Sequence, residues 1–268
     1  MTNEFKTRTI TGLLLVFLIG TAILLGGLWF WATSLLLSTL FFKEYINIYK
    51  DKKSHGFFFS TGIIGILYYV GIYLNFKFTL QISLLLLLIY GAFHVITKYP
   101  KYTYKNIKTT IFGFLYCYMF LSSLYLLRSE ERGLHWILFI LLVSILGDVG
   151  AYLVGKRIGK TKIAPILSPG KTLEGLIGGL ILATIGGVFY GVVIIELAIP
   201  LSALICIAIV FIGLMGDLFE SHLKREVNLK DTGTSLPGHG GFLDRFDAII
   251  FISGFVYILL EAQKWIKL

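Results

Sequence analysis

Residues 10–42 read ITGLLLVFLIGTAILLGGLWFWATSLLLSTLFF, which is 33 residues without a charged side chain. A helix needs about 20 apolar residues to cross the hydrocarbon core of a membrane, which is roughly 30 Å thick. The run is too long for one ordinary crossing and slightly short for two. We predict two helices that separate at Gly26-Gly27, and the stretch favours a membrane protein.

The composition of the whole chain supports this class. Of 268 residues, 56% are hydrophobic and 15% are charged, whereas soluble proteins have about 45–50% and about 25%. A soluble fold of this size could not hide so much apolar surface. The net charge of +9 lacks the basic soluble face that nucleic-acid binding needs, so we expect no nucleic acid as partner. Cys117 and Cys206 lie in apolar stretches, which excludes a disulfide-stapled secreted fold.

Seven further apolar runs follow the first one. They cover residues 57–76, 78–97, 109–127, 134–154, 175–197, 200–219 and 246–260. Backbone groups in lipid must find partners within their own segment, and the runs lack the alternation of a membrane β-barrel. We therefore predict an all-α, polytopic membrane helix bundle with about nine transmembrane helices.

The basic residues predict the orientation of this bundle. Cytoplasmic loops carry an excess of Lys and Arg. With the N-terminus inside, 19 of the 24 basic residues lie inside, and the other five are Lys77, Arg128, Arg132, Lys264 and Lys267. The loops 98–108, 155–174 and 220–243 then share the cytosolic side. The first apolar run has no cleavage site of a removable signal peptide, and a bacterial cytoplasmic (inner) membrane is the expected location.

The unusual polar residues are concentrated in the second half of the chain. Residues 1–108 contain only simple basic loops between spans, whereas residues 148–247 contain nearly every unexpected polar side chain. Within a single integral membrane unit, we therefore distinguish N-terminal spans (1–108) from a catalytic region (109–268).

Some carboxylates lie within predicted spans, among them Asp148 and Asp217. A carboxylate at the centre of a membrane helix costs about 2.5–3.5 kcal/mol and is by default a functional candidate. Asp148 and Asp217 are such residues, although each could instead be an interfacial residue bonded to a neighbouring helix. Helical spacing carries Glu220, Ser221 and Lys224 along the face of Asp217. For Glu220 and Lys224, an ordinary solvated helix pair is the better interpretation.

Residues 236–250, LPGHGGFLDRFDAII, contain the start of the last predicted helix. Asp244 could cap this helix, with Asp247 forming a capping-box-like pair. Alternatively, both carboxylates face Asp217, and such a cluster suits Mg²⁺, which binds through one or two carboxylates plus substrate phosphates. His239 could donate to a phosphate or hold the loop.

The loop 155–175, GKRIGKTKIAPILSPGKTLEG, is basic. Its SPGKT turn superficially matches the end of a phosphate-binding P-loop, but Pro165 stands where the motif needs Gly and no strand is expected before it. The basic residues could also be topology determinants or contacts to anionic lipid headgroups.

The chain resembles the phosphatidate cytidylyltransferases, also called CDP-diacylglycerol synthases. The pattern S-x-x-K-R-x4-K-D-x-G-x3-P-x-H-G-G-x-x-D-R-x-D of that family recurs at Ser221, Lys224, Arg225, Lys230, Asp231, Gly233, Pro237, His239, Gly240, Gly241, Asp244, Arg245 and Asp247. The stretch from Asp148 through Gly155 and Gly159 to residues 168–175 is similar to a further region of the family. The N-terminal spans agree only in being apolar.

The resemblance implies a homodimeric membrane enzyme that uses Mg²⁺, with a possible second cation, to join phosphatidic acid to CTP, giving CDP-diacylglycerol and pyrophosphate. We expect Asp217 and Asp244 to hold the metal, with Asp148 and Asp247 as further ligands, and Lys224 and Arg225 to neutralise phosphates. The expected substrate-binding residues are Ser168, Lys171, Thr172, Glu174, Ser221, Lys230, Asp231, His239, Gly240, Gly241 and Arg245. Backbone amides at residues 239–241 are expected to cradle a phosphoryl group.

Two other functions remain as alternatives. A CTP-dependent polyprenol kinase would share the membrane and the nucleotide but would release CDP rather than pyrophosphate. A transporter would use Asp148 and Asp217 as ion-coupling sites, but it needs a site near the midplane that is reached from both sides. The predicted polar cluster lies on one side only.

Overall fold

The computed structural model describes residues 3–49, 56–229, 231–233, 235–238 and 240–266. In these ranges the regular secondary structure is helical apart from one two-stranded hairpin and an isolated bridge between Leu236 and Gly240. The predicted all-α class is confirmed.

The long N-terminal apolar run forms two helices, as predicted. α1 (Asn3–Leu25) and α2 (Gly27–Tyr49) have 23 residues each and separate at Gly26. Both helices continue beyond the uncharged run, α1 toward the N-terminus and α2 past Phe42. This continuation explains how a run that is slightly short for two crossings still supports two full-length helices.

Within the part of the chain that the structure describes, six helices are long and apolar enough to cross a membrane. They cover Thr7–Leu25, Thr79–Thr97, Tyr104–Ser129, Gly133–Ile158, Leu173–Ile195 and Ile199–Glu226. The protein is therefore an integral membrane protein. Each remaining predicted run also coincides with a helix, but the count of nine crossings stays a prediction.

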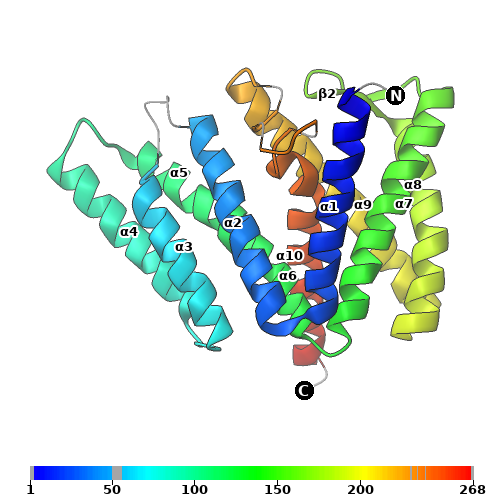
Figure 1. Cartoon of the computed structure of the whole chain (residues 1–268), viewed down its shortest axis with the longest axis horizontal. Coiled ribbons are helices and arrows are strands. Elements are labelled where there is room, and N and C mark those ends of the chain that lie inside the picture. The colour runs from blue at the N-terminus through cyan, green and yellow to red at the C-terminus, as the bar shows by residue number, and fades with distance from the viewer. Residues whose placement is uncertain (1–2, 50–55, 230, 234, 239, 267–268) are drawn as a thin grey trace. The chain divides into compact units, whose positions relative to one another are not determined.

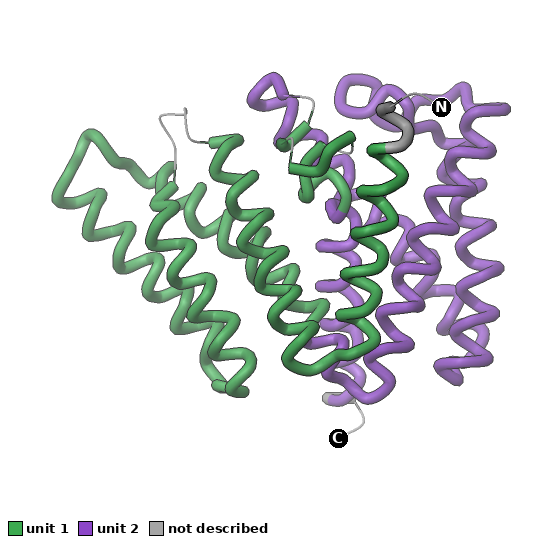
Figure 2. Tube along the Cα trace, viewed as in Figure 1, with its two compact units in different colours: residues 1–125, 231–245 green, residues 126–230, 246–268 purple. Residues whose placement is uncertain are grey.

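The chain divides into two compact units (Figure 2). Unit 1 comprises residues 1–125 and 231–245, and unit 2 comprises residues 126–230 and 246–268. This division rests on contacts alone, so the predicted separation of N-terminal spans (1–108) from a catalytic region (109–268) stays a prediction.

Unit 1 contains α1, α2, α3 (Phe58–Tyr73), α4 (Thr79–Thr97) and α5 (Tyr104–Phe114), which continues through the π-helical turn η1 (Leu115–Met119) into α6 (Phe120–Ser129) (Figure 1). Its core is aromatic, and it includes the fully buried Tyr69. The fully buried Tyr69 hydroxyl lies 2.9 Å from Ser34 Oγ and 2.6 Å from Ser38 Oγ. Such bonds join α2 to α3, because a buried tyrosine hydroxyl needs a partner.

Unit 2 contains α7 (Gly133–Ile158), the strands β1 (Lys162–Ala164) and β2 (Ser168–Thr172), α8 (Leu173–Tyr190) with the π-helical turn η2 (Gly191–Ile195), α9 (Ile199–Glu226), and most of α10 (Leu243–Ile266). The hairpin corrects the sequence prediction, which expected a turn at 168–172 and no strand before it. Strands of three and five residues give no periodic pattern that could have predicted them. The failed glycine spacing still excludes a P-loop.

Glycines allow α7 and α8 to pack closely. A Cβ atom on Gly150 would lie 2.6 Å from the backbone oxygen of Gly178, and one on Gly179 would lie 2.6 Å from the oxygen of Gly147. Membrane helices associate through such small residues, because apolar side chains gain little by leaving lipid. The close packing fixes the hairpin that connects the two helices.

We predict that Gly150→Leu lowers the thermal midpoint of the purified protein in detergent, because the two helices must separate at a cost of about 1–3 kcal/mol. Gly20→Leu is the matched control, since among the described residues no side chain and no other helix comes within 4 Å of a Cβ built at Gly20 in α1. Equal midpoints for the two variants would contradict the packing described.

Candidate active site

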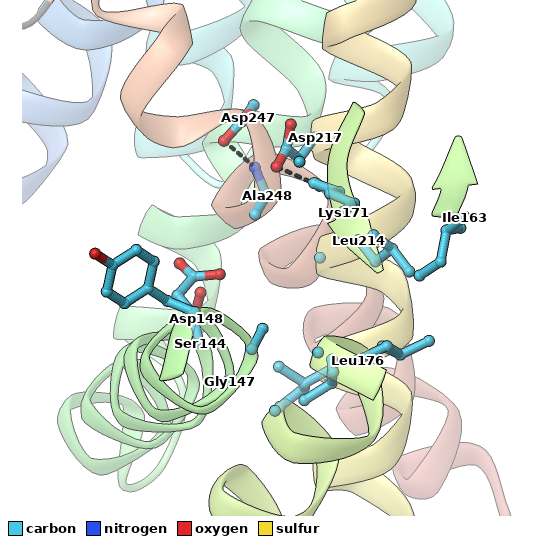
Figure 3. Close-up of a pocket in the computed structure, with 18 of the residues that line it drawn as sticks. Ser144, Gly147, Asp148, Ile163, Lys171, Leu176, Leu214, Asp217, Asp247 and Ala248 are labelled. Atoms are coloured by element: carbon cyan, nitrogen blue, oxygen red, sulfur yellow. Dashed lines mark hydrogen bonds and ion pairs between the residues drawn. The ribbon is translucent and has the colours of Figure 1, made fainter. Parts of the chain in front are cut away.

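A cavity of about 250 Å³ opens among α7, the hairpin, α8, α9 and α10 of unit 2. Most of its wall is apolar and includes Leu176, Ile209 and Leu214. Its charged groups are Asp148, Lys171, Asp217 and Asp247, which come from four different elements (Figure 3). The structure thus brings together three of the four predicted metal ligands and two predicted substrate-binding residues, Lys171 and Thr172.

Asp217 connects the charged groups of the cavity. Its Oδ2 atom forms an ion pair with Lys171 Nζ on β2, and its Oδ1 atom lies 3.4 Å from Ser221 Oγ, one helical turn further along α9. The predicted shared face of Asp217 and Ser221 is confirmed. Asp217 also interacts electrostatically with Asp148 and Asp247. Three acidic side chains therefore lie near Lys171.

Asp247 lies in the first turns of α10 and points toward Asp217 in the cavity (Figure 3). Its Oδ1 atom accepts the N–H of Ala248 at 2.7 Å. This bond differs from the capping-box-like pair with Asp244 that the sequence suggested as one alternative. Asp247 also lines the cavity that contains Asp217.

The hairpin that carries Lys171 is fixed by two of the predicted substrate-binding residues. Thr172 Oγ1 accepts the N–H of Gly175 at 3.2 Å and caps α8. Glu174 accepts the N–H groups of Lys160 at 3.0 Å and Thr161 at 3.1 Å, and the Thr161 hydroxyl at 2.9 Å. Both side chains hold the loop in this structure, and Ser168 begins β2 opposite Ala164. Thr172 and Glu174 thereby position Lys171.

The pair Glu220 and Lys224 on α9 differs from the solvated pair that the sequence favoured. Lys224 Nζ lies 2.6 Å from Glu220 Oε2, and the two side chains are only 13% and 2% exposed. The helical spacing was predicted correctly, but the burial was not, because neighbouring elements cover this face. The adjacent Arg225 is exposed and donates to the Leu229 oxygen at 3.2 Å.

The loop of unit 1 that precedes α10 and carries part of the family motif contacts Asp244. Asp244 Oδ2 accepts the N–H of Gly241 at 2.8 Å, and the N–H and hydroxyl of Thr232 at 3.0 and 3.1 Å. The sequence predicted that the Gly241 N–H binds a phosphoryl group; the structure gives it a protein acceptor instead, because the Asp244 carboxylate in the first turn of α10 reaches back to it. Gly240 is half-buried beside it, and Asp231 and Arg245 are exposed.

Two predicted residues lie outside the described residues, namely Lys230 and His239. Asp244 belongs to unit 1 and the cavity to unit 2. The prediction that Asp244 completes the cluster of Asp148, Asp217 and Asp247 therefore stays a prediction.

Glu44 is the residue that the sequence analysis missed. It lies near the end of α2, is 2% exposed, and accepts the N–H groups of Phe242 and Leu243 at 2.9 Å each. A single carboxylate next to Lys43, just after an apolar run, resembles an ordinary interfacial residue. Its one distinguishing feature in the sequence is that it is an acidic residue in a mainly basic loop.

The oxygen-rich cavity matches the donor chemistry of Mg²⁺. Among the described residues, no group of three or more His, Cys, Asp or Glu side chains is arranged to hold an ion by itself. Mg²⁺ rarely uses such all-protein sites and is usually bound by one or two carboxylates together with phosphates and water. The residues present fit an ion that arrives with a phosphorylated substrate.

Comparisons with known proteins extend over nearly the whole chain. Residues 6–263 match the cytidylyltransferase family. The chain is 35% identical over 263 residues to the phosphatidate cytidylyltransferase of Staphylococcus saprophyticus, covering 95% of this chain and 98% of that protein. It is 34% identical to the enzyme of the same name from Staphylococcus haemolyticus, with the same coverage, and 36% identical to that of Bacillus subtilis over 68% of each chain.

The match to the family and the identity to the two Staphylococcus enzymes cover the motif region and the N-terminal helices alike. The chain belongs to the cytidylyltransferase family.

Proposed function

We propose that this protein is a phosphatidate cytidylyltransferase, which transfers CMP from CTP to phosphatidic acid and yields CDP-diacylglycerol and pyrophosphate. The observation that carries the proposal is a cavity with apolar walls and charged groups, formed by helices long enough to span a membrane. A lipid phosphate and a water-soluble nucleotide can meet in such a place. The relatives' names supply the substrate class.

The reaction needs charge neutralisation more than a general base. An oxygen of the lipid phosphate, already an anion, attacks the α-phosphorus of CTP; the new P–O bond forms as the bond to the β-phosphate oxygen breaks, and pyrophosphate leaves with the electron pair. The barrier is largely electrostatic, because highly charged anions must approach each other. Lys171 is placed to neutralise a phosphate, since it lies in the cavity and its partner Asp217 can instead contact a cation.

The carboxylates of the cavity are the proposed ligands of Mg²⁺. Asp217 and Asp247 lie close together, and Asp148 faces the same space from α7 (Figure 3). When bound, Mg²⁺ would neutralise the triphosphate. The carboxylates would orient the phosphates against Lys171, and the apolar wall would exclude water that could compete with the lipid phosphate.

The proposed setting is a bacterial cytoplasmic membrane, with the N-terminus and the site on the cytosolic side. The excess of basic residues in the loops on that side supports it. The resemblance to the enzyme family also motivates a homodimer, and the mass of the detergent-solubilised particle measures that property.

An assay with two radiolabels tests the function. Purified protein is incubated with phosphatidic acid, with or without Mg²⁺, and with CTP labelled on either the α- or the γ-phosphorus. We expect the α-label to enter the lipid phase and the γ-label to appear in pyrophosphate, in both cases only with Mg²⁺. In a parallel reaction with polyprenol, a lipid kinase would put the γ-label into the lipid and leave the α-label in CDP, and that result would overturn the proposal.

We predict that Asp217→Asn reduces turnover at least about 100-fold, because one preorganised charge in such a site is worth about 3 kcal/mol or more. The variant keeps the side-chain volume, so the protein should remain folded. Glu261→Gln is the matched control, since Glu261 pairs with Lys264 outside the cavity. Near-normal turnover of Asp217→Asn in detergent would remove Asp217 from the mechanism.

We predict that Lys224→Ala lowers the thermal midpoint strongly, because an unpaired buried carboxylate costs about 3–5 kcal/mol. Glu220→Ala/Lys224→Ala should recover most of this stability, since neither charge is then left alone. If Lys224 also neutralises phosphate, the stable double variant should have a raised KM for CTP. A single variant as stable as the parent would contradict the buried pair.

A further inference from the structure

Glu44 reaches the motif loop from a helix that carries no part of the motif. Its Oε1 atom accepts the N–H of Phe242, and its Oε2 atom accepts the N–H of Leu243 and the Thr232 hydroxyl, the latter at 3.0 Å. Phe242 and Leu243 mark the start of α10. A residue nearly 200 positions away in sequence thus supplies the acceptors that a helix N-terminus needs.

The Thr232 hydroxyl couples Glu44 to Asp244. This hydroxyl lies 3.0 Å from Glu44 Oε2 and 3.1 Å from Asp244 Oδ2. A hydroxyl carries one hydrogen, so two carboxylate oxygens share a single side-chain donor. This donor links the two carboxylates, and Asp244 Oδ2 also accepts the N–H groups of Thr232 and Gly241.

Two glycines of the motif fit around the Glu44 carboxylate. A Cβ atom on Gly241 would lie 2.5 Å from Glu44 Oε2, and one on Gly233 would lie 3.2 Å from Glu44 Oε1. In this structure these positions are small because the carboxylate fills the space beside them. The explanation requires no substrate phosphate.

The arrangement has an energetic consequence. A buried carboxylate is costly unless it is fully hydrogen-bonded, and bonds from backbone N–H groups to a charged oxygen are among the strong ones. Removing the charge would leave the N–H of Phe242 or Leu243 without a good acceptor. We therefore expect the residues around Phe242 and Leu243 to become disordered while the helices of unit 1 stay folded.

From these contacts we propose that Glu44 is a positioning residue of the transferase: it fixes Thr232 and the segment 240–243 and, through Thr232, the orientation of Asp244 at the start of α10. Glu44 acts through these groups and touches no substrate. The proposal rests on the proposed function for its catalytic readout, although the order of the loop can be measured independently.

The test compares Glu44→Gln with Ser38→Ala. Glutamine keeps the size of Glu44 but offers one acceptor oxygen in place of two. Ser38 lies on the same helix, is fully buried and bonds Tyr69, so its replacement removes a buried bond of α2 away from the loop. Amide hydrogen exchange over residues 240–244, kcat and the KM for CTP are measured for both full-length variants in detergent.

For Glu44→Gln we expect exchange at Phe242 and Leu243 to be faster and kcat to be lower, each by about 10- to 100-fold, which is the range for a lost bond to a charged group. The KM for CTP should change by less than about threefold, because Glu44 touches no nucleotide. Ser38→Ala should keep loop protection and kcat near those of the parent, even at a lower thermal midpoint.

Unchanged loop exchange and kcat in Glu44→Gln would overturn the proposal, and so would equal losses in Ser38→Ala, because the effect would then be general stability. If Glu44→Gln does not fold, Thr232→Val provides the second test: it removes only the shared hydroxyl and should lower kcat in a stable protein, and unchanged kcat would overturn the coupling to Asp244. An inactive parent enzyme would refute the proposed function but leave the exchange comparison valid.

Discussion

A carboxylate in an apolar setting must be paired or hydrogen-bonded, and this constraint organises both units of the protein. Asp217 is paired with Lys171, Glu220 with Lys224, and Glu44 with the first N–H groups of α10 and the Thr232 hydroxyl. Asp217 is thus joined to a strand, Glu220 to the next turn of its own helix, and Glu44 to a loop. The polar elements of the protein are held in place by these few contacts.

The constraint also explains how apolar helices can support phosphate chemistry. The close α7–α8 contact fixes the ends of the hairpin, Thr172 and Glu174 fix the hairpin itself, and the hairpin presents Lys171 to Asp217. The surrounding apolar wall keeps the effective dielectric low, so the charges act strongly on any bound phosphate. The three acidic side chains near Lys171 offer oxygen ligands of the kind that Mg²⁺ prefers, which favours a substrate accompanied by a cation.

The sequence predicted the fold class, the break at Gly26-Gly27 and the shared face of Asp217 and Ser221, because these follow from apolar run length and helical spacing. It did not predict the hairpin, whose strands are too short for a pattern. It misjudged the burial of Glu220 and Lys224, which depends on other elements. Glu44 was missed because its partners lie nearly 200 residues away, and the Gly241 N–H was assigned to substrate because a loop motif does not show which protein acceptor already fills it.

The most direct test of the central claim is an experimental structure of the protein with Mg²⁺ and a non-hydrolysable CTP analogue. The account predicts triphosphate density in the cavity of unit 2, within contact distance of Lys171, with the cation against Asp217 and Asp247. Density for the nucleotide at any place that leaves Asp217 and Lys171 paired and untouched would contradict it.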